Sequence, residues 1–471
     1  MVLKISVILR KASNMKNCFA PINQIPAETL ALVAAFLPME RDLINATAVC
    51  QHWRAILLSF PRLWYNAGGR SSELEAYLER SKSVPIQVNL LRPELVVSII
   101  PHTSRLVDLT ICVGNSREFN DATCSLRYPI PTLRSFEIYT DNLLMHHLEL
   151  PSGIGEDLFL HLKKLRLDGI LSLIGPQTFP HITELSLSIS SSCQNSISAL
   201  LGTLEQLPGL EKVHAAFESY WDSGTHSTGV VTLPCVQEMY LSIPDYGCRN
   251  DSAVIPLILQ HLKFPKLTSL TVDSPSSFLF GPSILPVAFF SEHLPNYFEL
   301  PEVRIDTTAS SGKIVFRSPS QAVITFHTGV LMAYKRERQF WGDLPVSSVR
   351  RVTVVLVDPE FGVEDRWLVG MFRELIYLDL LELGGDCGWV LRCLRRRVAR
   401  GAVWLGIRTL VVRGGEYARR QALKLESVKG DLAGLQDTTV TYIQDPEVRE
   451  ELSWSDDESS ESDSSSDYSD E

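Results

Sequence analysis

One short template of apolar residues recurs along most of this chain of 471 residues. Each copy has an apolar residue, two variable residues, a second apolar residue, one variable residue and a third apolar residue. The copies start at Leu106, Leu133, Leu162, Ile182, Leu210, Val236, Leu267, Val349, Leu375 and Ile407. Neighbouring starts are usually roughly 20 to 32 residues apart. Because the last two apolar residues of a copy flank a variable one, each copy predicts a half-buried β-strand.

The length and apolar spacing of these copies resemble leucine-rich repeats, which run roughly 20–29 residues and supply one strand each. The asparagine that usually follows the strand in that family is missing from almost every copy, so we expect irregular repeats. Residues 195–207 and 253–262 are helix-like and lie between strands. The sequence therefore predicts an α/β fold in which residues 93–444 form an irregular solenoid. An ordinary α/β domain with parallel strands is the alternative, since it also alternates strands and helices.

Residues 275–345 interrupt the rhythm of the template. Within them, residues 313–316 and 322–326 flank Ser318-Pro319-Ser320, a pattern that predicts a β-hairpin. This section is therefore predicted to be an irregular insert or an antiparallel part of the solenoid.

The segment from Ile22 to Tyr65 has a different pattern and predicts three short helices. Pro26 suits the first position of a helix and Glu28 its first turn. We expect Asp42 to cap the second helix and Thr47 the third. The first helix is apolar on two sides, with Leu30, Val33, Ala34 and Leu37 on one side and Leu32 and Phe36 on the other. Three short helices bury little surface by themselves, so part of this apolar surface needs a cover.

The residue order in this segment resembles the F-box, a helical module that binds the adaptor subunit of SCF-type ubiquitin ligases. The resemblance is carried by Ile-Pro-x-Glu at 25–28, Asp-Leu at 42–43, Val-Cys-x-x-Trp-Arg at 49–54 and Leu-Trp at 63–64. Isoleucine stands at position 25, where the family usually has leucine. The resemblance implies adaptor contacts by Ile25, Pro26, Glu28, Leu30, Leu43, Val49, Cys50, Trp53, Leu63 and Trp64. Alternatively, these residues form the core of a small bundle packed on the next domain.

The F-box-like domain is expected to span residues 22–66, with residues 67–92 forming a linking helix and a capping strand. Ser72 and Glu75 have the spacing of a capping box. The predicted buried positions are Leu74, Tyr77 and Leu78 of the helix and Ile86, Val88 and Leu90 of the strand. Together with Trp64, this stretch resembles the corresponding junction in F-box-like proteins of mushroom-forming fungi.

Negative charge is concentrated at the C-terminal end. The formal net charge is −11, and residues 455–471 contain eight acidic residues and no Lys or Arg, which leaves −3 for the rest. No basic surface dominates, so a nucleic-acid partner is not expected. Residues 445–471 are predicted to be disordered, because the acidic, serine-rich sequence contains almost no apolar residues. Serines beside acidic residues suit acid-directed kinases of the casein-kinase type.

A group of arginines precedes the last repeat: Arg392, Arg395, Arg396, Arg397 and Arg400. Such a group is either one solvated helix face or a docking site for an anionic part of a target. Contact between these arginines and the acidic tail is a further hypothesis.

Residues 1–21 are predicted to form an unstructured leader. Lys4 and Arg10 interrupt any apolar stretch, so a secretory signal is not expected, and a mitochondrial presequence is the alternative on charge alone. The longest uncharged apolar runs fall far short of the roughly 20 residues that cross a bilayer, so no membrane partner is expected. The nine cysteines are scattered, which favours reduced thiols in the cytoplasm and/or nucleus.

Motifs of nucleotide-binding proteins, serine hydrolases and zinc proteases are absent from the sequence. His146 and His147 are adjacent, and Cys387 and Cys393 flank Trp389 without a histidine pattern, so neither pair predicts a metal site. We therefore expect no metal, no cofactor and no enzymatic activity. The predicted function is substrate recognition in an SCF-type ubiquitin ligase, with the adaptor, through it the cullin, and an unidentified target protein as partners. A scaffold without a ubiquitin-ligase role and an enzyme whose site is assembled from loops are the alternatives.

Overall fold

The computed structural model of the chain describes the following residues: 21–37, 40–68, 71–126, 128–140, 160–168, 179, 181–189, 196–217, 229–242, 254–274, 302–307, 312–317, 323–328, 349–356, 378–385, 387, 390–391, 407–414, 416–428 and 438–444. Predictions for residues 1–20 of the leader expected at 1–21, the His146–His147 pair, Cys393, the five arginines at 392–400 and the acidic tail lie outside these residues. Pro21, the last residue of the expected leader, begins a short helix.

The chain divides into two compact units. Unit 1 comprises residues 1–300 and 315–345, and unit 2 comprises residues 301–314 and 346–471. The division passes through strand β13 (Gly312–Arg317), which lies at the first strand of the predicted hairpin. The second strand of that hairpin corresponds to β14 (Val323–Thr328).

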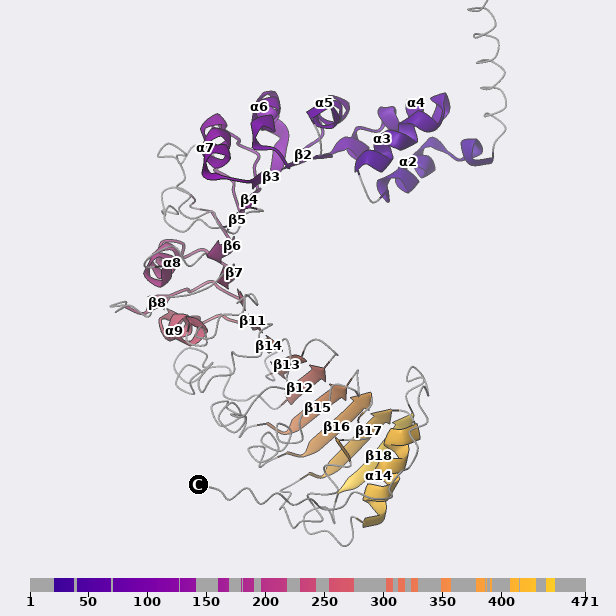
Figure 1. The fold of residues 1–471 in the computed structure, drawn as a ribbon, viewed down its shortest axis with the longest axis vertical. Helices are drawn as coiled ribbons and strands as arrows, with labels where there is room; N and C mark the ends of the chain where they lie inside the picture. The colour runs from indigo at the N-terminus through magenta and orange to yellow at the C-terminus, as the bar shows by residue number, and fades with distance from the viewer. Residues whose placement is uncertain are drawn as a thin grey trace, which may run out of the picture. The chain divides into compact units, whose positions relative to one another are not determined.

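A helical module, residues 21–68, opens unit 1 (Figure 1). Its elements are η1 (Pro21–Gln24), α2 (Ala27–Ala35), α3 (Glu40–Val49), α4 (Gln51–Ser59) and η2 (Pro61–Trp64). The helical character of this segment is confirmed, but two predicted caps are wrong. Asp42 lies inside α3, because that helix begins at Glu40. Cys50, and not Thr47, caps α4, since its Sγ accepts a hydrogen bond from the Trp53 amide at 3.4 Å.

The core of the module is formed by residues of α2, α3, α4 and η2. Its buried apolar residues are Leu30, Ala31, Ala34, Leu43, Ala46, Ile56, Leu57 and Trp64. Helix α2 packs on α4, and Leu30, Ala31 and Ala34 are its buried residues. Of the residues expected on one side of the first helix, Leu30 and Ala34 are buried, whereas Val33 and Leu37 are 55% and 36% exposed.

Unit 1 continues as a parallel sheet whose strands follow one another in chain order. Its strands are β1 (Asn66–Gly68), β2 (Ile86–Leu90), β3 (Leu106–Val113), β4 (Ser135–Thr140), β5 (Lys164–Asp168), β6 (Glu184–Ile189), β7 (Lys212–Phe217), β9 (Glu238–Ser242), β11 (Ser269–Ser274) and β14. A doubly wound sheet would reverse its strand order at some point. Because each strand joins the same growing edge, this part is a sheet-rich, solenoid-like region, as predicted.

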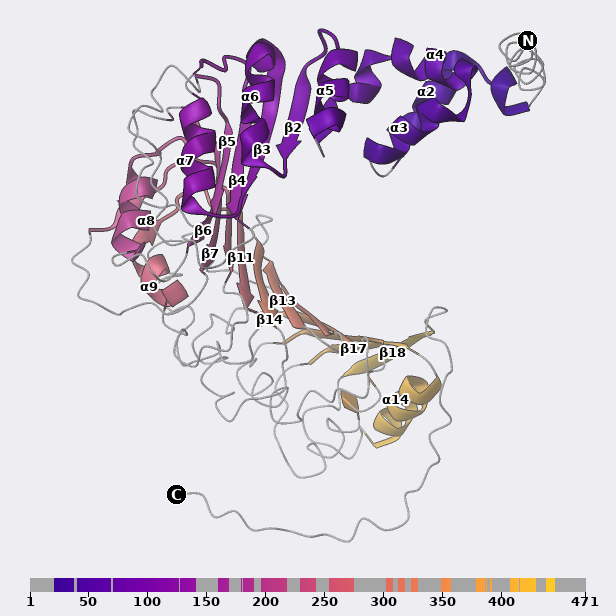
Figure 2. The ribbon, with the colours of Figure 1, turned by 45° about the horizontal axis from the view of Figure 1, so that its top comes forward.

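Helices lie between these strands: α5 (Ser71–Arg80), η3 (Pro93–Leu95), α6 (Val96–Ile99), η4 (Ile100–Arg105), α7 (Ser116–Ser125), α8 (Ser196–Glu205) and α9 (Val254–Gln260). Helices α6, α7, α8 and α9 lie on the same side of the strands (Figures 1 and 2). A separate parallel pair is formed by β8 (Val231–Thr232) and β10 (Leu262–Lys263). Helix α5 begins at Ser71, so the predicted cap Ser72 lies inside the helix, whereas Leu74, Tyr77 and Leu78 are buried as predicted.

The template residues form the core beneath the sheet of unit 1. All three apolar residues are buried in the copies that start at Leu106, Leu133, Leu162, Ile182, Leu210, Val236 and Leu267. The first residue of each copy lies just before the strand or at its start, and the other two point to the buried face. Burial of an apolar side chain contributes roughly 1.5–3 kcal/mol, so the repeated template supplies the main stabilising term of the solenoid-like region.

Unit 2 contains a second set of parallel strands: β12 (Glu302–Thr307), β15 (Arg351–Leu356), β16 (Leu380–Gly385), β17 (Thr409–Gly414) and β18 (Thr439–Gln444). Helix α14 (Glu416–Val428) packs on β17 and β18. The register of β12 pairs Val303 with Val352 and Ile305 with Val354. The template spacing therefore extends to β12, inside the section that interrupts the sequence pattern.

One predicted repeat has the wrong frame. Its first residue was placed at Leu375, but β15 pairs Val352 with Leu381 and Val354 with Leu383. Leu378, Leu381 and Leu383 are buried, so this copy starts at Leu378. Closely spaced leucines satisfy the template in two overlapping frames, and only pairing with the neighbouring strand selects the buried one.

A backbone ladder links successive repeats at the start of the strands. The carbonyl oxygen of Arg134 accepts hydrogen bonds from the amides of Lys163 and Lys164 at 2.8 and 2.9 Å. The Lys163 carbonyl accepts in the same way from Thr183 and Glu184, at 2.9 Å each. The pattern continues through the carbonyls of Thr183, Glu211 and Gln237. Main-chain groups thus provide regular bonds between repeats that lack the usual asparagine.

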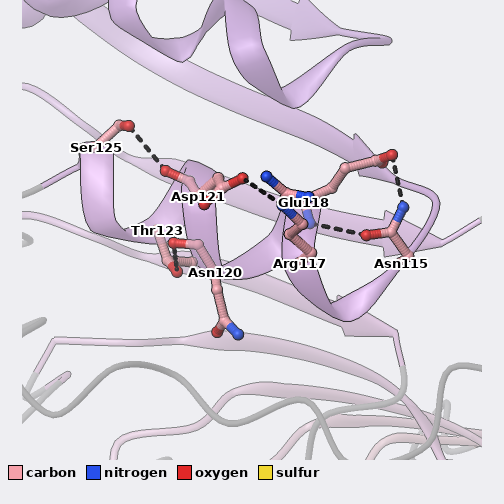
Figure 3. Close-up of polar contacts among 7 residues, drawn as sticks. All are labelled: Asn115, Arg117, Glu118, Asn120, Asp121, Thr123 and Ser125. Atoms are coloured by element: carbon pink, nitrogen blue, oxygen red, sulfur yellow. Dashed lines mark hydrogen bonds and ion pairs between the residues drawn. The ribbon is translucent and has the colours of Figure 1, made fainter.

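Helix α7 has a well-defined N-terminal cap (Figure 3). The Asn115 Oδ1 accepts a hydrogen bond from the Glu118 amide at 2.9 Å, and its Nδ2 donates to Glu118 Oε1 at 2.7 Å. Glu118 Oε2 accepts from the Gly114 amide at 2.8 Å. The two side chains therefore satisfy amide groups that the first turn of a helix leaves free.

Replacing Asn115 by alanine is expected to lower the free energy of unfolding of this repeat by about 1 kcal/mol, because the amide of Glu118 loses its acceptor. Hydrogen exchange of the α7 amides measures the change. Asn120→Ala, on the exposed surface of the same helix, is the control and should leave exchange almost unchanged. Equal exchange rates in both variants would contradict the capping role.

Candidate functional site

Exposed apolar side chains are concentrated in the helical module. Half of the large apolar side chains that are exposed in the described part of the chain lie between Ile22 and Tyr65. They are Ile22, Leu32, Val33, Phe36, Leu37, Val49 and Tyr65. Phe36, at the end of α2, is 85% exposed. Such a concentration of exposed apolar surface is typical of an interaction site.

The residues predicted to contact an adaptor fall into three groups. Leu30, Leu43 and Trp64 are buried in the module core, so their side chains support the surface and do not form it. Ile25, Cys50, Trp53 and Leu63 are partly buried. Pro26, Glu28 and Val49 are exposed. The structure thus places the three buried side chains in the module core, and the adaptor contacts implied for the whole set stay a prediction.

Trp64 is the central core residue of the module and is fully buried. Its indole Nε1 donates a hydrogen bond to the Leu57 carbonyl at 3.0 Å. Its ring meets the Tyr77 ring edge-to-face, with 4.9 Å between the centroids, and the Arg80 guanidinium lies 4.5 Å from its centroid. Tyr77 and Arg80 belong to α5, the first helix after the module. Trp64 therefore packs the helical module against α5.

Trp53 makes a hydrogen bond within the module. Its Nε1 donates a hydrogen bond to Asn23 Oδ1 at 2.8 Å, which ties η1 to α4. The neighbouring Arg54 donates from Nε to the Thr47 carbonyl at 3.0 Å and links α4 to the end of α3. These two contacts tie η1 and the end of α3 to α4.

Sequence reasoning missed Ile22, Leu32, Phe36 and Leu37 as candidate contact residues. One feature of the sequence could have indicated them: the first helix is apolar on two sides. A helix of this small module can bury only one of those sides, so the other is left for a partner. The structure decides which one: Leu30, Ala31 and Ala34 face inward, and Leu32 and Phe36 face solvent.

A second candidate surface is the face of the unit 1 sheet opposite the buried template residues. We use the name β6–β11 grid for the residues of β6, β7, β9 and β11 on this face. The register places them in three rows: Glu184, Lys212, Glu238 and Ser269; Ser186, His214, Tyr240 and Thr271; Ser188, Ala216, Ser242 and Asp273. None of these residues is buried.

Polar contacts organise the middle row of the grid. Ser186 Oγ lies 3.4 Å from His214 Nδ1, and the His214 and Tyr240 rings meet edge-to-face at 4.3 Å between centroids. Tyr240 donates its hydroxyl hydrogen to Asp273 Oδ2 at 2.5 Å. Burial and this bond raise the pKa of Tyr240 to about 12. Partial desolvation lowers the pKa of His214, the charge of Arg166 lowers this pKa further, and the charge of Asp273 acts to raise it.

Unit 2 carries an ionic contact across three strands. Glu382 accepts hydrogen bonds from Arg351 at 3.2 Å and from Arg413 at 2.6 Å. Burial alone would raise the pKa of Glu382, but the two arginines outweigh it and lower the pKa. These side chains join β15, β16 and β17, so we assign them a structural role.

Within the described ranges, no group of three or more His, Cys, Asp and Glu side chains is arranged to hold a metal ion. Cys387 is buried, with its Sγ 4.0 Å from the Arg413 carbonyl oxygen. No helix in the described part of the chain is both long and apolar enough to span a membrane.

Comparison with known proteins identifies the helical module. Residues 22–68 match the F-box-like family, so this part of the chain is an F-box-like domain. The chain also resembles a chain in the crystal structure of the Rad7 and Elc1 complex in yeast, with 12% sequence identity. That likeness covers 88% of this chain and 94% of the other chain, at a TM-score of 0.24, which is too low to establish a shared fold. A comparison with curated proteins gave no match.

Proposed function

We propose that the chain is a substrate-recognition subunit of an SCF-type ubiquitin ligase. The observation that carries the proposal is the F-box-like domain at residues 22–68, whose helices leave Leu32, Phe36 and Val49 exposed. In this proposal the exposed surface binds the adaptor subunit, and the adaptor connects the chain to the cullin. The open strand face holds a target protein.

The proposed role requires no catalytic residue in this chain. The subunit acts by holding its target near the ubiquitin donor, which raises the effective concentration of the target there. The fixed contact between Trp64 and α5 supports this role, because it joins the adaptor-binding surface to the strands that would carry the target. The arginines at 392–400 remain a candidate docking site for an anionic part of a target.

We also propose a cytoplasmic and/or nuclear location and a relationship to F-box-like proteins of mushroom-forming fungi. The nine cysteines are scattered along the sequence without close spacings, which supports a reducing compartment. The fungal relationship is supported by the sequence from Trp64 to Leu90 alone. A protein-interaction scaffold that takes no part in ubiquitination is the second candidate function, since a helical module on a sheet also suits that role.

The double variant Leu32→Asp with Phe36→Asp is expected to abolish capture of the SCF adaptor by the purified chain. Both side chains are exposed, at 63% and 85%, so the module should remain folded while its apolar contact surface gains two charges. Pull-down of recombinant adaptor measures the effect, and circular dichroism verifies folding.

The matched control is Leu91→Asp with Val97→Asp, which places two charges at exposed apolar positions outside the F-box-like domain. This control should capture the adaptor as well as the wild-type chain does. Failure of the wild-type chain to capture the adaptor would favour the scaffold. If the folded Leu32/Phe36 variant captures the adaptor as well as the wild type does, the adaptor binds to another part of the chain.

A further inference from the structure

The β6–β11 grid is a sheet face that bears an excess of negative charge. Within its three rows, Glu184, Glu238 and Asp273 are acidic, and Lys212 is basic. Glu211, which is exposed and directly precedes β7, adds a further carboxylate. On the adjoining strand β5, Lys164 lies opposite Glu184 and forms an ion pair with Glu137 of β4 at 3.1 Å. Arg166 and Asp168 of β5 lie 3.8 Å apart as a second ion pair, so neither pair adds net charge. The grid therefore calls for a positively charged partner.

The single basic residue of the grid is already surrounded by carboxylates. Lys212 Nζ lies 3.0 Å from Glu238 Oε2. The pKa of Lys212 lies above its ordinary value, because Glu238 accepts its hydrogen bond and Glu184 and Glu211 contribute further negative charge. Lys212 therefore offsets one of these three carboxylate charges, and Lys164, which lies opposite Glu184 on β5, is itself paired with Glu137.

The other two rows provide space and aromatic surface for long side chains. His214 and Tyr240 present aromatic rings at the centre of the grid. In the next row, Ser188, Ala216 and Ser242 are small, and Asp273 closes the row. An arginine side chain can lie against an aromatic ring and at the same time donate to a carboxylate with its planar guanidinium group. Asp273 uses Oδ2 for Tyr240, and a carboxylate has acceptor sites beyond that one.

We propose that the β6–β11 grid binds a basic, arginine-containing segment of a protein target. The charge complementarity defines this occupant, since an acidic segment or a nucleic-acid backbone would meet like charge at Glu184, Glu238 and Asp273. The alternation of acidic, aromatic and small rows fits a segment whose arginines cross from the aromatic centre to the carboxylates. This inference rests on the proposed function, because it names the chemistry of the target that the receptor would hold.

The test measures fluorescence anisotropy of a labelled short peptide of alternating Arg and Gly with the full chain. The grid variant combines Glu184→Gln with Asp273→Asn, which removes two charges but leaves residue 273 able to accept a hydrogen bond from Tyr240. We expect this variant to bind the peptide roughly tenfold more weakly than the wild type, since each exposed charge contributes up to about 1 kcal/mol. Binding to the wild type should weaken between low salt and about 0.15 M salt.

The matched control is Glu94→Gln with Glu205→Gln, which removes two exposed acidic charges away from the grid. All three proteins carry the same acidic tail, so any peptide that the tail binds contributes equally, and only the grid variant should lose affinity. Equal affinity of the grid and control variants overturns the inference. Equal binding by the wild type of a peptide with Glu in place of Arg also overturns it.

Adaptor capture separates this inference from the proposed function. The grid variant should capture the adaptor as the wild type does, because its substitutions lie outside the F-box-like domain. Loss of peptide binding with adaptor capture intact supports the inference. Failure of adaptor capture by the wild type, together with peptide binding that depends on the grid, overturns the proposed function and leaves the basic-segment surface standing.

Discussion

Replacing Trp64 by alanine is expected to destabilise the helical module by about 3–5 kcal/mol, the usual cost of removing a fully buried large aromatic side chain. The substitution removes the hydrogen bond to the Leu57 carbonyl and the edge-to-face contact between the Trp64 and Tyr77 rings. Arg80 also loses the aromatic surface over which it lies. Hydrogen exchange of the α2–α4 amides measures the loss, because it reports on local stability in a chain of two units.

Two further variants establish the cause of this loss. Trp64→Phe retains an aromatic ring against Tyr77 and should recover a large part of the stability. Trp53→Ala removes a tryptophan that is only partly buried, together with its hydrogen bond to Asn23, and should cost less than Trp64→Ala. If the α2–α4 amides of Trp64→Ala exchange as slowly as those of the wild type, Trp64 does not hold the module on α5.

Replacing Arg105 by methionine is expected to destabilise the junction between α5 and β3 by about 3 kcal/mol, since several acceptors lose a charged donor. Arg105 donates to Ser81 Oγ at 2.6 Å and to the carbonyls of Val84 and Leu78 at 3.3 and 2.5 Å. A guanidinium group at the end of a helix also interacts favourably with the helix dipole. Methionine preserves much of the apolar stem, so the measured loss reflects the hydrogen bonds.

The control for Arg105 is Arg117→Met on α7. Arg117 lies 3.8 Å from Asp121 in an i,i+4 ion pair, and its side chain is 91% exposed. Removing such a pair should change stability by at most about 0.5 kcal/mol. Hydrogen exchange of the α5 and β2 amides distinguishes the two variants. Equal protection of these amides in both would refute the assigned role of Arg105.

The repeats show which features of the fold can be predicted from the spacing of apolar residues. A template of three apolar residues determines which side of each strand is buried, because side chains alternate along a strand. The copies from Leu106 to Leu267 therefore could be placed from sequence alone. The copy near Leu378 could not, since several leucines fit the template in overlapping frames and the choice depends on the register with β15. The hydrogen bonds between repeats could not be predicted from the sequence either, because main-chain groups form them.

In the F-box-like domain, too, some features could be predicted from the sequence and others could not. Its family resemblance and its helices follow from local order, from Pro26 to Trp64. The contact residues do not, because local order says which side chains are apolar and not which of them the other helices cover. In the folded module Leu30, Ala31 and Ala34 are buried, whereas Leu32 and Phe36 are exposed to solvent.

By itself, the sequence determined that a helical, F-box-like segment precedes a long array of strand-forming repeats. Such features depend on residue order over a few positions and on the alternation of side chains. Only the tertiary structure decided which apolar side chains are exposed, which frame a repeat takes and which charged residues become neighbours. Glu184, Lys212, Glu238 and Asp273 are distant in the chain, and the parallel register alone brings them onto one face.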